Sequence, residues 1–378
     1  MSGVTVVTTS FAREIGGQQA AGSFVEDFCS AVNRHLPVSI VAPGGQDEVD
    51  EFAGMPVYRY AAPERPLSQL RVMNPANWPA ILRVLRNGQG AVLRAVERNR
   101  PAYIFALWAL PSGQWARAAS RRYGVPYGIW CLGSDIWSLG RVPVVRKVLG
   151  RVMHGAADLF ADGFALADEA ALLADRSCGF LASARRLEIA SRTPRTEPPY
   201  RLVFIGRWHP NKGIDLLLEA LRGLDDKYWT RIESIDIAGG GPLEALVRQQ
   251  CGELENAGRP VRLHGYVDKA QASSMLAGAD WLMIPSRIES IPVIFSDAMS
   301  AGLPVLATPV GDLPRLLQSK RAGVLAAAAT GEALRHGLQQ LLTDSPASYV
   351  DGVNALRSQF DIDEVAAAFC RRITGSRR

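Results

Sequence analysis

The chain has 378 residues, of which 48% are hydrophobic and 21% charged, and its formal net charge is +5. This length favours two domains over one, and the balanced composition excludes a disordered or low-complexity protein. No hydrophobic run reaches the roughly 18 residues that a membrane-spanning helix needs. The first residues, "MSGVTVVTTS", are typical of a strand and not of a signal peptide. The five cysteines show no metal-ligand spacing, which is typical of a protein in the reducing cytosol.

Positive charge is concentrated in the first half of the chain. Residues 65–151 contain 14 basic residues and two acidic ones. In the first half, "WPAILRVLRNGQGAVLRAVERNR" (78–100) and "RVPVVRKVLGRVMHG" (141–155) mix apolar spacing with arginines. One interpretation is a surface that rests on anionic lipid, and the other is sheet-covering helices with solvated arginines. Nucleic acid is not an expected partner, because no binding motif and no interleaved aromatic pattern occurs.

Short apolar strands alternate with helical stretches along the chain, a pattern typical of parallel sheets with crossover helices. In the first half we expect strands at 4–8, 38–41, 103–108 and 127–131, and helices at 23–34, 112–123 and 144–153. The stretch "SRTPRTEPPYR" (191–201) predicts an interdomain linker, because breakers and turn formers replace a periodic apolar face. After it we expect strands at 202–205, 235–238, 261–264, 281–284 and 305–307, and helices at 213–224, 242–257, 270–276 and 293–300.

This alternation predicts an α/β fold with two Rossmann-like, doubly wound domains facing across a cleft. We expect the domains at 1–195 and 196–358, with a C-terminal helix at 359–378 that packs back on the first domain. Ligands of such folds bind at the carboxyl ends of the strands, here in the cleft. The pattern alone does not distinguish a transferase from a dehydrogenase.

Three stretches of the second half place glycine or charge just after a predicted strand. In the first, "LVFIGRWHPNKGIDLLLEAL", Gly206 and Arg207 follow the strand, and Lys212 and Gly213 begin a helix. Two cations beside a helix amino terminus suit a diphosphate. Taken alone, solvated loop charges would be the simpler interpretation.

The second stretch, "IDIAGGGPLEALV", ends a strand with Gly239, Gly240 and Gly241. Pro242 is expected at the first helical position, where its missing N–H costs nothing. Such a turn lets the backbone approach a ligand closely. Glycine-rich turns of this kind are common, so the signal is weak by itself.

The third stretch, "SRIESIPVIFSDAMSAGLPVLATPVGD" (286–312), carries two acids around an apolar helix. Glu289 is expected at the mouth of the cleft, and Asp297 could accept hydrogen bonds from the vicinal hydroxyls of a ribose. An anion bound there would face the backbone of Ser290, Ile291, Pro292 and Val293. The alternative is a helix with one surface acid at each end.

Together these stretches resemble the retaining family 4 glycosyltransferases, which have two Rossmann-like domains in the GT-B arrangement. The matching positions are Gly206, Arg207, Lys212 and Gly213; Gly239, Gly241 and Pro242; "HGYV" at 264–267; and Glu289 through Pro304. The first half resembles the less specific acceptor domain of that family, in "AGSFVEDFCSAV" (21–32) and "LWALPSGQWARAASRRYGVPYGIWCLGSDIW" (107–137). The resemblance covers most of the chain and is strongest over residues 202–311.

The resemblance implies a retaining, metal-independent hexosyltransferase without a cofactor, which moves a sugar from a nucleotide-diphosphate sugar to a glycan or lipid-linked acceptor. Surface polysaccharide or glycolipid biosynthesis is the implied setting, in the cytoplasm and peripheral on the inner face of an anionic membrane. The implied catalytic residues are Arg207, Lys212 and Glu289. The implied donor-binding residues are Gly22, Gly206, Gly240, Gly241, Pro242, Tyr266, Ser290, Ile291, Pro292, Val293 and Asp297, and the acceptor-side candidates are Gly133, Ser134 and Asp135.

The chain departs from the family pattern at several positions. Asp297 stands where the family has Glu, Pro292 where it has Gly, and Leu132 where it frequently has His. Leu132 motivates an alternative, a catalytically silent GT-B protein that binds a nucleotide sugar or scaffolds partner transferases. A nicotinamide-dependent oxidoreductase lacks support, because the first strand is not followed by a Gly-x-Gly-x-x-Gly turn. Asp135 is open to two interpretations, a general base or a helix-start cap.

Overall fold

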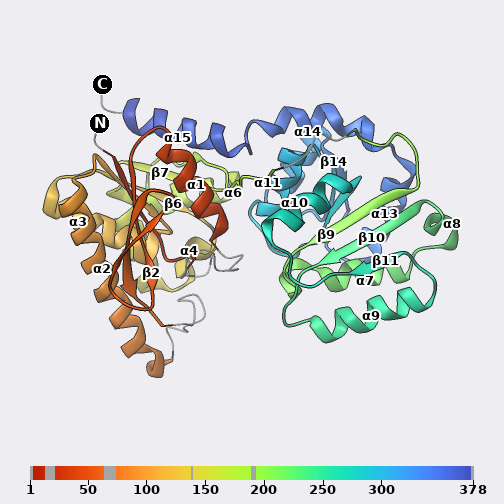
Figure 1. The fold of residues 1–378 in the computed structure, drawn as a ribbon, viewed down its shortest axis with the longest axis horizontal. Helices are drawn as coiled ribbons and strands as arrows, with labels where there is room; N and C mark the ends of the chain where they lie inside the picture. The colour runs from red at the N-terminus through yellow and green to blue at the C-terminus, as the bar shows by residue number, and fades with distance from the viewer. Residues whose placement is uncertain (1–2, 13–21, 64–73, 138, 189–192, 376–378) are drawn as a thin grey trace. The chain divides into compact units, whose positions relative to one another are not determined.

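The computed structural model describes residues 3–12, 22–63, 74–137, 139–188 and 193–375. Its chain divides into two compact units, unit 1 with Met1–Ala182 and Ile362–Arg378, and unit 2 with Ser183–Asp361. Each unit contains a largely parallel sheet between helices (Figure 1), so the predicted α/β class with two Rossmann-like domains is confirmed. Part of the expected linker at 191–201 lies outside the described residues.

Unit 1 is built on a sheet with the order β3-β4-β2-β1-β5-β6-β7-β8. Its neighbouring strands run parallel, except for the antiparallel pair β3 and β4. The strands are β1 (Val4–Val7), β2 (Val38–Gly44), β3 (Val49–Phe52), β4 (Met55–Ala61), β5 (Tyr103–Leu107), β6 (Tyr127–Cys131), β7 (Asp158–Ala161) and β8 (Gly179–Phe180). The helices are α1 (Ser23–Asn33), α2 (Trp78–Asn99), α3 (Gln114–Tyr123), α4 (Ser134–Trp137), α5 (Pro143–His154), α6 (Phe164–Ala174) and α15 (Ile362–Gly375).

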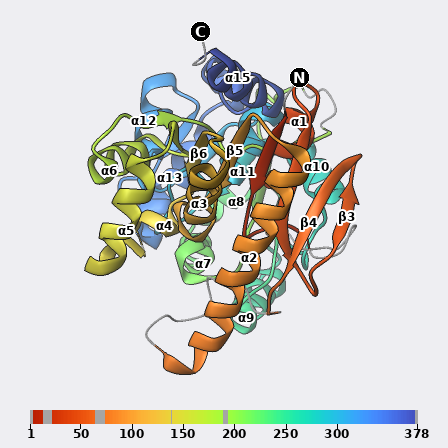
Figure 2. The same ribbon diagram turned by 90° about the vertical axis from the view of Figure 1, so that its left-hand side faces the viewer.

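The two faces of this sheet bury different sets of helices. Side chains alternate along a strand, so Ile104 and Ala106 join a core with α2, α3, α5 and α6. Phe105 points to the opposite face, where its ring lies 4.4 Å from that of Phe369 in α15. Phe28 of α1 packs on the same Phe369 ring at 5.3 Å. The carboxyl-terminal helix therefore completes the hydrophobic core of unit 1 together with α1 (Figure 2).

Unit 2 has the strand order β11-β10-β9-β12-β13-β14, and these strands all pair in parallel. The strands are β9 (Tyr200–Ile205), β10 (Ile232–Ala238), β11 (Val261–Leu263), β12 (Trp281–Ile284), β13 (Val305–Ala307) and β14 (Gly323–Leu325). The helices are α7 (Ile214–Arg222), α8 (Asp226–Trp229), α9 (Glu244–Asn256), α10 (Lys269–Gly278), α11 (Val293–Ala301), α12 (Leu313–Lys320), α13 (Gly331–Thr343) and α14 (Val350–Arg357).

The order of these strands creates a switch point. The chain adds strands outward from β9 to β11, then returns to place β12 on the other side of β9 and continues to β14. Helices α7, α9 and α13 cover one face, and α10, α11 and α14 pack together on the other. Because the helices that follow β9 and β12 lie on opposite faces, their loops diverge at this point and leave room for a ligand.

Helix α9 begins at Glu244, so the expectation that Pro242 occupies the first helical position is wrong. Gly241 has a φ of 148°, which only glycine adopts easily. The amide of Leu243 then donates to the carbonyl of Trp208 at 3.0 Å, and the amide of Glu244 donates to that of Gly241 at 3.0 Å. A turn tied to the neighbouring loop therefore precedes the helix.

Within the described residues, no helix combines the length and apolar character that crossing a membrane requires.

We expect Phe369→Ala to lower the free energy of unfolding of unit 1 by about 3–5 kcal/mol, because it removes a buried ring that four others contact. Denaturant unfolding followed by circular dichroism measures this loss. Arg371→Ala is the control, since Arg371 is exposed on the same helix, and its effect should stay within about 0.5 kcal/mol. A similar effect of both substitutions would show that α15 does not contribute to the core.

Candidate functional site

A lysine and a glutamate meet at the switch point of unit 2. Lys212 lies in the loop after β9, Glu289 lies in the loop after β12, and their side chains form an ion pair. The Lys212 side chain is 38% exposed and that of Glu289 is 13% exposed, so the pair is open to solvent on one side. The hydroxyl of Ser286 donates to the same carboxylate oxygen at 3.3 Å. These contacts bring together two of the predicted catalytic residues.

Close backbone contact between two loops positions Lys212. Gly213 has a φ of 67°, and a Cβ at this position would overlap the carbonyl oxygen of Pro285. The amide of Arg287 donates to the carbonyl of Asn211 at 2.8 Å. The loop after β9 can therefore lie directly against the end of β12 because residue 213 has no side chain.

The side chain of Arg287 also connects the same two loops. Its guanidinium makes a bidentate ion pair with Asp215, at 2.8 and 2.6 Å, and donates to the carbonyl of Pro210 at 2.7 Å. Partial burial works to raise the pKa of Asp215, but the hydrogen bonds and the charge of Arg287 outweigh it and lower that pKa. Two forked hydrogen bonds fix orientation as well as distance, so Arg287 acts as a positioning residue for Lys212.

The loop that carries Glu289 is supported from behind by the loop after β13. The amide of Asp312 donates to the carbonyl of Ser290 at 3.2 Å, and the hydroxyl of Thr308 donates to the carbonyl of Ser286. Gly311 has a φ of 53°, and a Cβ there would overlap the carbonyl oxygens of Glu289 and Ser290. This second close approach fixes the backbone of Glu289.

The glycine turn after β10 packs on the loop after β9. The amide of Trp208 donates to the carbonyl of Gly240 at 2.8 Å. Gly239 has a φ of 145°, and a Cβ there would overlap the carbonyl oxygen of Gly206. A Cβ on Gly240 would come within 2.5 Å of the Tyr266 ring, which is 73% exposed. The turn is thus covered by an aromatic ring that has a free face.

Arg207 differs from Lys212 in its surroundings. It is exposed, and its Cγ lies 3.3 Å from the position that a Cβ on Gly241 would occupy. Among the described residues no carboxylate forms an ion pair with it, whereas Lys212 is already paired. The loop after β9 therefore presents one neutralised cation and one solvated cation.

Two buried donors near these loops have no acceptor within the described part of the chain. One is the hydroxyl of Ser290 and the other is the indole N–H of Trp208. A Cβ on Gly239 would lie 3.0 Å from that indole nitrogen. Helix α11 begins at Val293 after Pro292, and the amide of Phe295 donates to the carbonyl of Pro292 at 2.8 Å, so the amides of Val293 and Ile294 are the ones that lack intrahelical partners. Unpaired donors of this kind are satisfied by water or by a ligand.

Asp297 lies inside α11, and its side chain is fully buried. Its carboxylate forms an ion pair with Arg185, and Nε of Arg185 donates to it at 3.2 Å. Arg185 is itself only 17% exposed. A ribose that reaches Asp297 must therefore share the carboxylate with this guanidinium.

The remaining candidates belong to unit 1. Gly22 precedes α1 with a φ of 116°, and Gly133 precedes α4 with a φ of 92°. Ser134 begins α4, and Asp135 beside it is 1% exposed. The Asp135 carboxylate accepts hydrogen bonds from the amides of Ala109 at 2.8 Å and Ile136 at 3.2 Å.

Burial raises the pKa of Asp135, although these backbone hydrogen bonds oppose the effect. Because both carboxylate oxygens face the backbone, Asp135 ties the start of α4 to the end of β5. This arrangement agrees with a capping role more than with a general base.

Within the described residues, no group of three or more histidine, cysteine, aspartate or glutamate side chains could hold a metal ion.

Four residues of the candidate site were not identified from the sequence. The pairing of Arg185 with Asp297 spans 112 positions, which no local pattern reveals. Arg287 and Asp215 could have been suspected, because each lies within three residues of a predicted catalytic residue. Trp208 gave a weak signal, as a large aromatic residue in an otherwise polar loop.

Comparison with known proteins gives a family match within unit 2 and a relative that matches most of the chain. Residues 199–344 match the family described as glycosyl transferases group 1. TuaC of Bacillus subtilis, a glycosyltransferase named for teichuronic acid biosynthesis, is 26% identical over 367 residues, which cover 90% of this chain and 86% of TuaC.

Solved structures agree in fold. Sucrose-phosphate synthase of Thermosynechococcus elongatus has a TM-score of 0.72 at 16% identity, with 99% of each chain covered. HepE of Anabaena, solved with UDP and glucose, has a TM-score of 0.71 at 14% identity, with 99% of this chain and 100% of that chain covered. The chain therefore has the GT-B fold, and residues 199–344 within its unit 2 match the glycosyl transferases group 1 family.

Proposed function

We propose that the protein transfers a sugar, with retention of configuration and without a metal ion, from a nucleotide-diphosphate sugar that unit 2 binds. The ion pair of Lys212 and Glu289 at the switch point carries this proposal. A cation and an acid placed side by side can serve the two halves of such a donor, the diphosphate and the sugar. The binding of UDP by HepE, a neighbour in fold, supports a donor of this class.

The diphosphate is the part of the donor that the loop after β9 fits best. Cleavage of the sugar–phosphate bond leaves negative charge on the diphosphate, so a cation fixed there lowers the barrier in the transition state. Lys212 and Arg207 would supply that charge, and the first amides of α11 and the free donors of Ser290 and Trp208 would add hydrogen bonds. In this role Arg287 keeps Lys212 in place.

The neighbouring loops would bind the other parts of the donor. Glu289, freed from Lys212 by the arriving diphosphate, would accept hydrogen bonds from the sugar hydroxyls. The turn at Gly239–Gly241 lets the nucleoside approach the backbone, beside the exposed face of Tyr266. Asp297 would hold the ribose hydroxyls together with Arg185. The acceptor is proposed to be a growing glycan or a glycolipid, which the name of the relative TuaC supports.

The proposed contacts of Lys212 and Arg207 with the diphosphate predict that Lys212→Ala and Arg207→Ala each lower kcat/KM of sugar transfer by about 100- to 1,000-fold, the usual effect of losing one transition-state contact. Transfer is measured with radiolabelled UDP- and GDP-sugars and a membrane extract as the acceptor source. Arg222→Ala is the control, because this arginine is exposed at the far end of α7. Near wild-type rates in both the Lys212→Ala and the Arg207→Ala variant would remove these cations from the mechanism.

Glu289→Gln should separate donor binding from transfer. The substitution releases Lys212 from its ion pair, so UDP or GDP should bind at least as tightly as to the wild type. Transfer should fall by about 100-fold because the contact with the sugar is lost. Titration calorimetry measures the first effect and the transfer assay the second. An equal fall of affinity and rate would show that Glu289 only maintains the loop.

For Asp297→Asn we predict that the protein no longer distinguishes UDP from 2′,3′-dideoxy-UDP, or the corresponding guanosine nucleotides, whereas the wild type binds the dideoxy form about 10-fold less tightly. Thermal shift with each nucleotide reports the affinities. Arg185→Ala is the matched variant, which keeps the carboxylate and removes its partner. If Asp297→Asn weakens the binding of both nucleotides equally, Asp297 supports packing and does not bind the ribose.

A further inference from the structure

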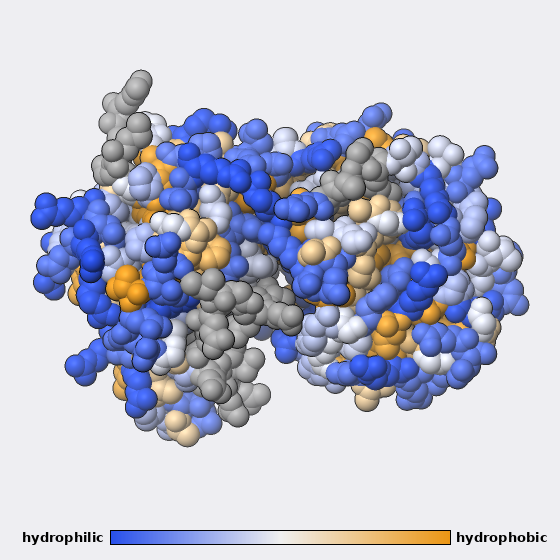
Figure 3. Space-filling model, viewed as in Figure 1, coloured by the Kyte–Doolittle hydropathy of each residue, from blue (hydrophilic) through white to orange (hydrophobic). Residues whose placement is uncertain are grey.

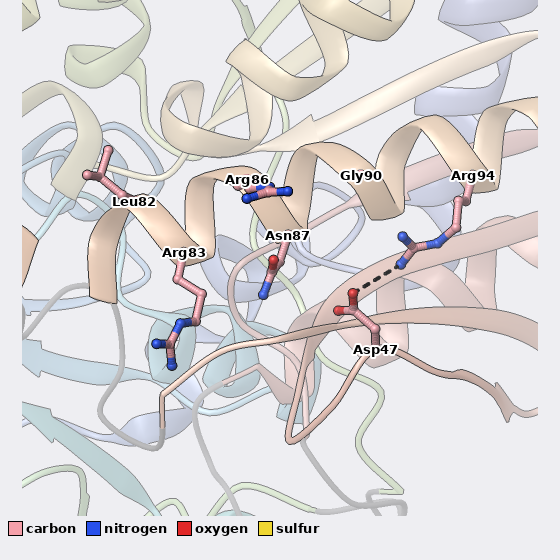
Figure 4. Close-up of a pocket in the computed structure, with 7 residues that line it drawn as sticks. All are labelled: Asp47, Leu82, Arg83, Arg86, Asn87, Gly90 and Arg94. Atoms are coloured by element: carbon pink, nitrogen blue, oxygen red, sulfur yellow. Dashed lines mark ion pairs between the residues drawn. The ribbon is translucent and has the colours of Figure 1, made fainter. Parts of the chain in front are cut away.

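A pocket of about 520 Å³ lies between α2 and the loop after β2 in unit 1, and it is here called the α2 pocket. Volumes of this size are typical of sites for small ligands. Figure 4 shows Arg83, Asn87 and Arg94 directed to the side of α2 on which Asp47 of the loop lies. Arg86 also lines the pocket. Charged and amide side chains therefore form most of its wall.

Two hydrogen bonds place the α2 pocket at the carboxyl edge of the unit 1 sheet. The carboxylate of Asp47 accepts from the amide of Ala61, the last residue of β4, at 2.8 Å. The side-chain amide of Asn87 donates to the carbonyl of the same residue at 3.1 Å. Ligands of α/β folds bind at this edge. Because the donor is proposed to bind unit 2, the second substrate is the ligand expected at the edge of unit 1.

Positive charge in the α2 pocket exceeds negative charge. Arg94 pairs with Asp47 at 3.8 Å. Arg83 and Arg86 are exposed, and neither forms an ion pair or a hydrogen bond with another described residue. Among the described residues that line the pocket, Asp47 is the one carboxylate. Three guanidinium groups beside a single carboxylate leave an excess of positive charge that suits an anionic ligand.

Gly90 leaves open space in the wall of the α2 pocket. It lies one helical turn from both Arg86 and Arg94. Glycine inside a helix lowers stability relative to alanine, and packing does not require it here. A Cβ on Gly90 would approach Nη1 of Arg94 no closer than 3.5 Å, whereas a Cβ on Gly88 would lie 2.3 Å from the Trp115 ring. The missing side chain at position 90 is therefore explained by the space that it leaves for a ligand.

We propose that the α2 pocket binds an acidic sugar residue of the acceptor through the carboxylate or phosphate group of that sugar. This inference rests on the proposed function and names the class of acceptor. Arg83 and Arg86 would bind the anionic oxygens with forked hydrogen bonds. Asn87 and Asp47 would bind hydroxyl groups of the sugar.

The composition of the wall favours a sugar over a nucleotide or a lipid surface. None of the described residues that line the pocket is aromatic, so a nucleobase would find no stacking partner. Hydrophilic residues predominate on the surface around α2, with smaller hydrophobic patches between them (Figure 3). Asp47 would repel a layer of anionic headgroups, but it can accept a hydrogen bond from a sugar hydroxyl. A neutral sugar would leave Arg83 and Arg86 without partners.

Titration calorimetry of the full chain with a galacturonate trisaccharide tests the proposal, with the galactose trisaccharide of the same linkage for comparison. We expect the wild type to bind the galacturonate form at least about 10-fold more tightly, because hydrogen bonds to charged groups are the stronger ones. Arg83→Gln with Arg86→Gln should remove this preference. Glucose 6-phosphate, titrated in parallel with glucose, distinguishes a phosphate from a carboxylate as the preferred group.

Gly90→Leu tests the pocket without a change in charge. The leucine should fill the space beside Arg86 and Arg94 and weaken binding of the anionic sugar by about 10-fold or more. The Tm should not fall, because leucine favours a helix more than glycine does. A lower Tm together with unchanged affinity would show that position 90 serves the fold and not a ligand.

Arg121→Gln with Arg122→Gln is the matched control for charge. It makes the same change in net charge in the last turn of α3, outside the residues that line the α2 pocket, and should leave sugar binding unchanged. An equal loss in this control would overturn the proposal. So would a requirement for Arg83 and Arg86 in binding phosphatidylglycerol vesicles but neither anionic sugar.

Titration of each variant with UDP and GDP separates this inference from the proposed function. The nucleotide is proposed to bind unit 2, so its affinity should stay at the wild-type value in all the α2 variants. A wild type that binds a nucleotide but prefers neither anionic sugar to its neutral counterpart would overturn the assignment of the pocket alone. A wild type that binds neither nucleotide would instead contradict the proposed function.

Discussion

The candidate site depends on the direct contact of backbones at the carboxyl edge of the unit 2 sheet. Gly213 lies against Pro285, Gly239 against Gly206, and Gly311 against Glu289. Each glycine has a positive φ and no side chain, so neighbouring loops approach more closely than other residues allow. The meeting of Lys212 and Glu289 from two separate strands is a result of this packing. A larger residue in place of any of these glycines would displace the neighbouring loop, and so would disturb the site without any contact of its own with a ligand.

The fold class and most of the loops of the site could be predicted from the sequence. Parallel strands, glycine turns and the charges beside them are local patterns. Each depends on residues that are close together in the sequence, so each can be predicted from a single segment. The first turn of α9 was placed wrongly, because Pro242 suits a helix start in isolation. In the structure, the residues before α9 form a turn that is joined to another loop by the hydrogen bond of Leu243 to Trp208. That contact is not part of the local sequence pattern.

The partners of the charged residues could not be predicted. Asp297 was expected to be available to a ligand, but Arg185 reaches it from a segment that precedes β9. Likewise Asp135 in unit 1 bonds to the backbone of a segment 26 residues earlier. Side chains of this kind find their partners only after the sheets assemble, and their burial follows from that assembly. A motif therefore indicates where a charge lies, while the fold decides what neutralises it.

The ion pair between the Glu289 carboxylate and the Lys212 ammonium affects which anions can bind there. A ligand that takes over the ammonium must offer more attraction than an acid already anchored beside it, so chloride or a simple carboxylate gains little by entering. A diphosphate, with several negative oxygens, can attract the Lys212 ammonium more strongly than the Glu289 carboxylate does. In the proposed function, the Glu289 carboxylate would return to Lys212 after transfer, compete with the bound nucleotide and favour its departure. The same ion pair would then both reject weak anions and help to release the product.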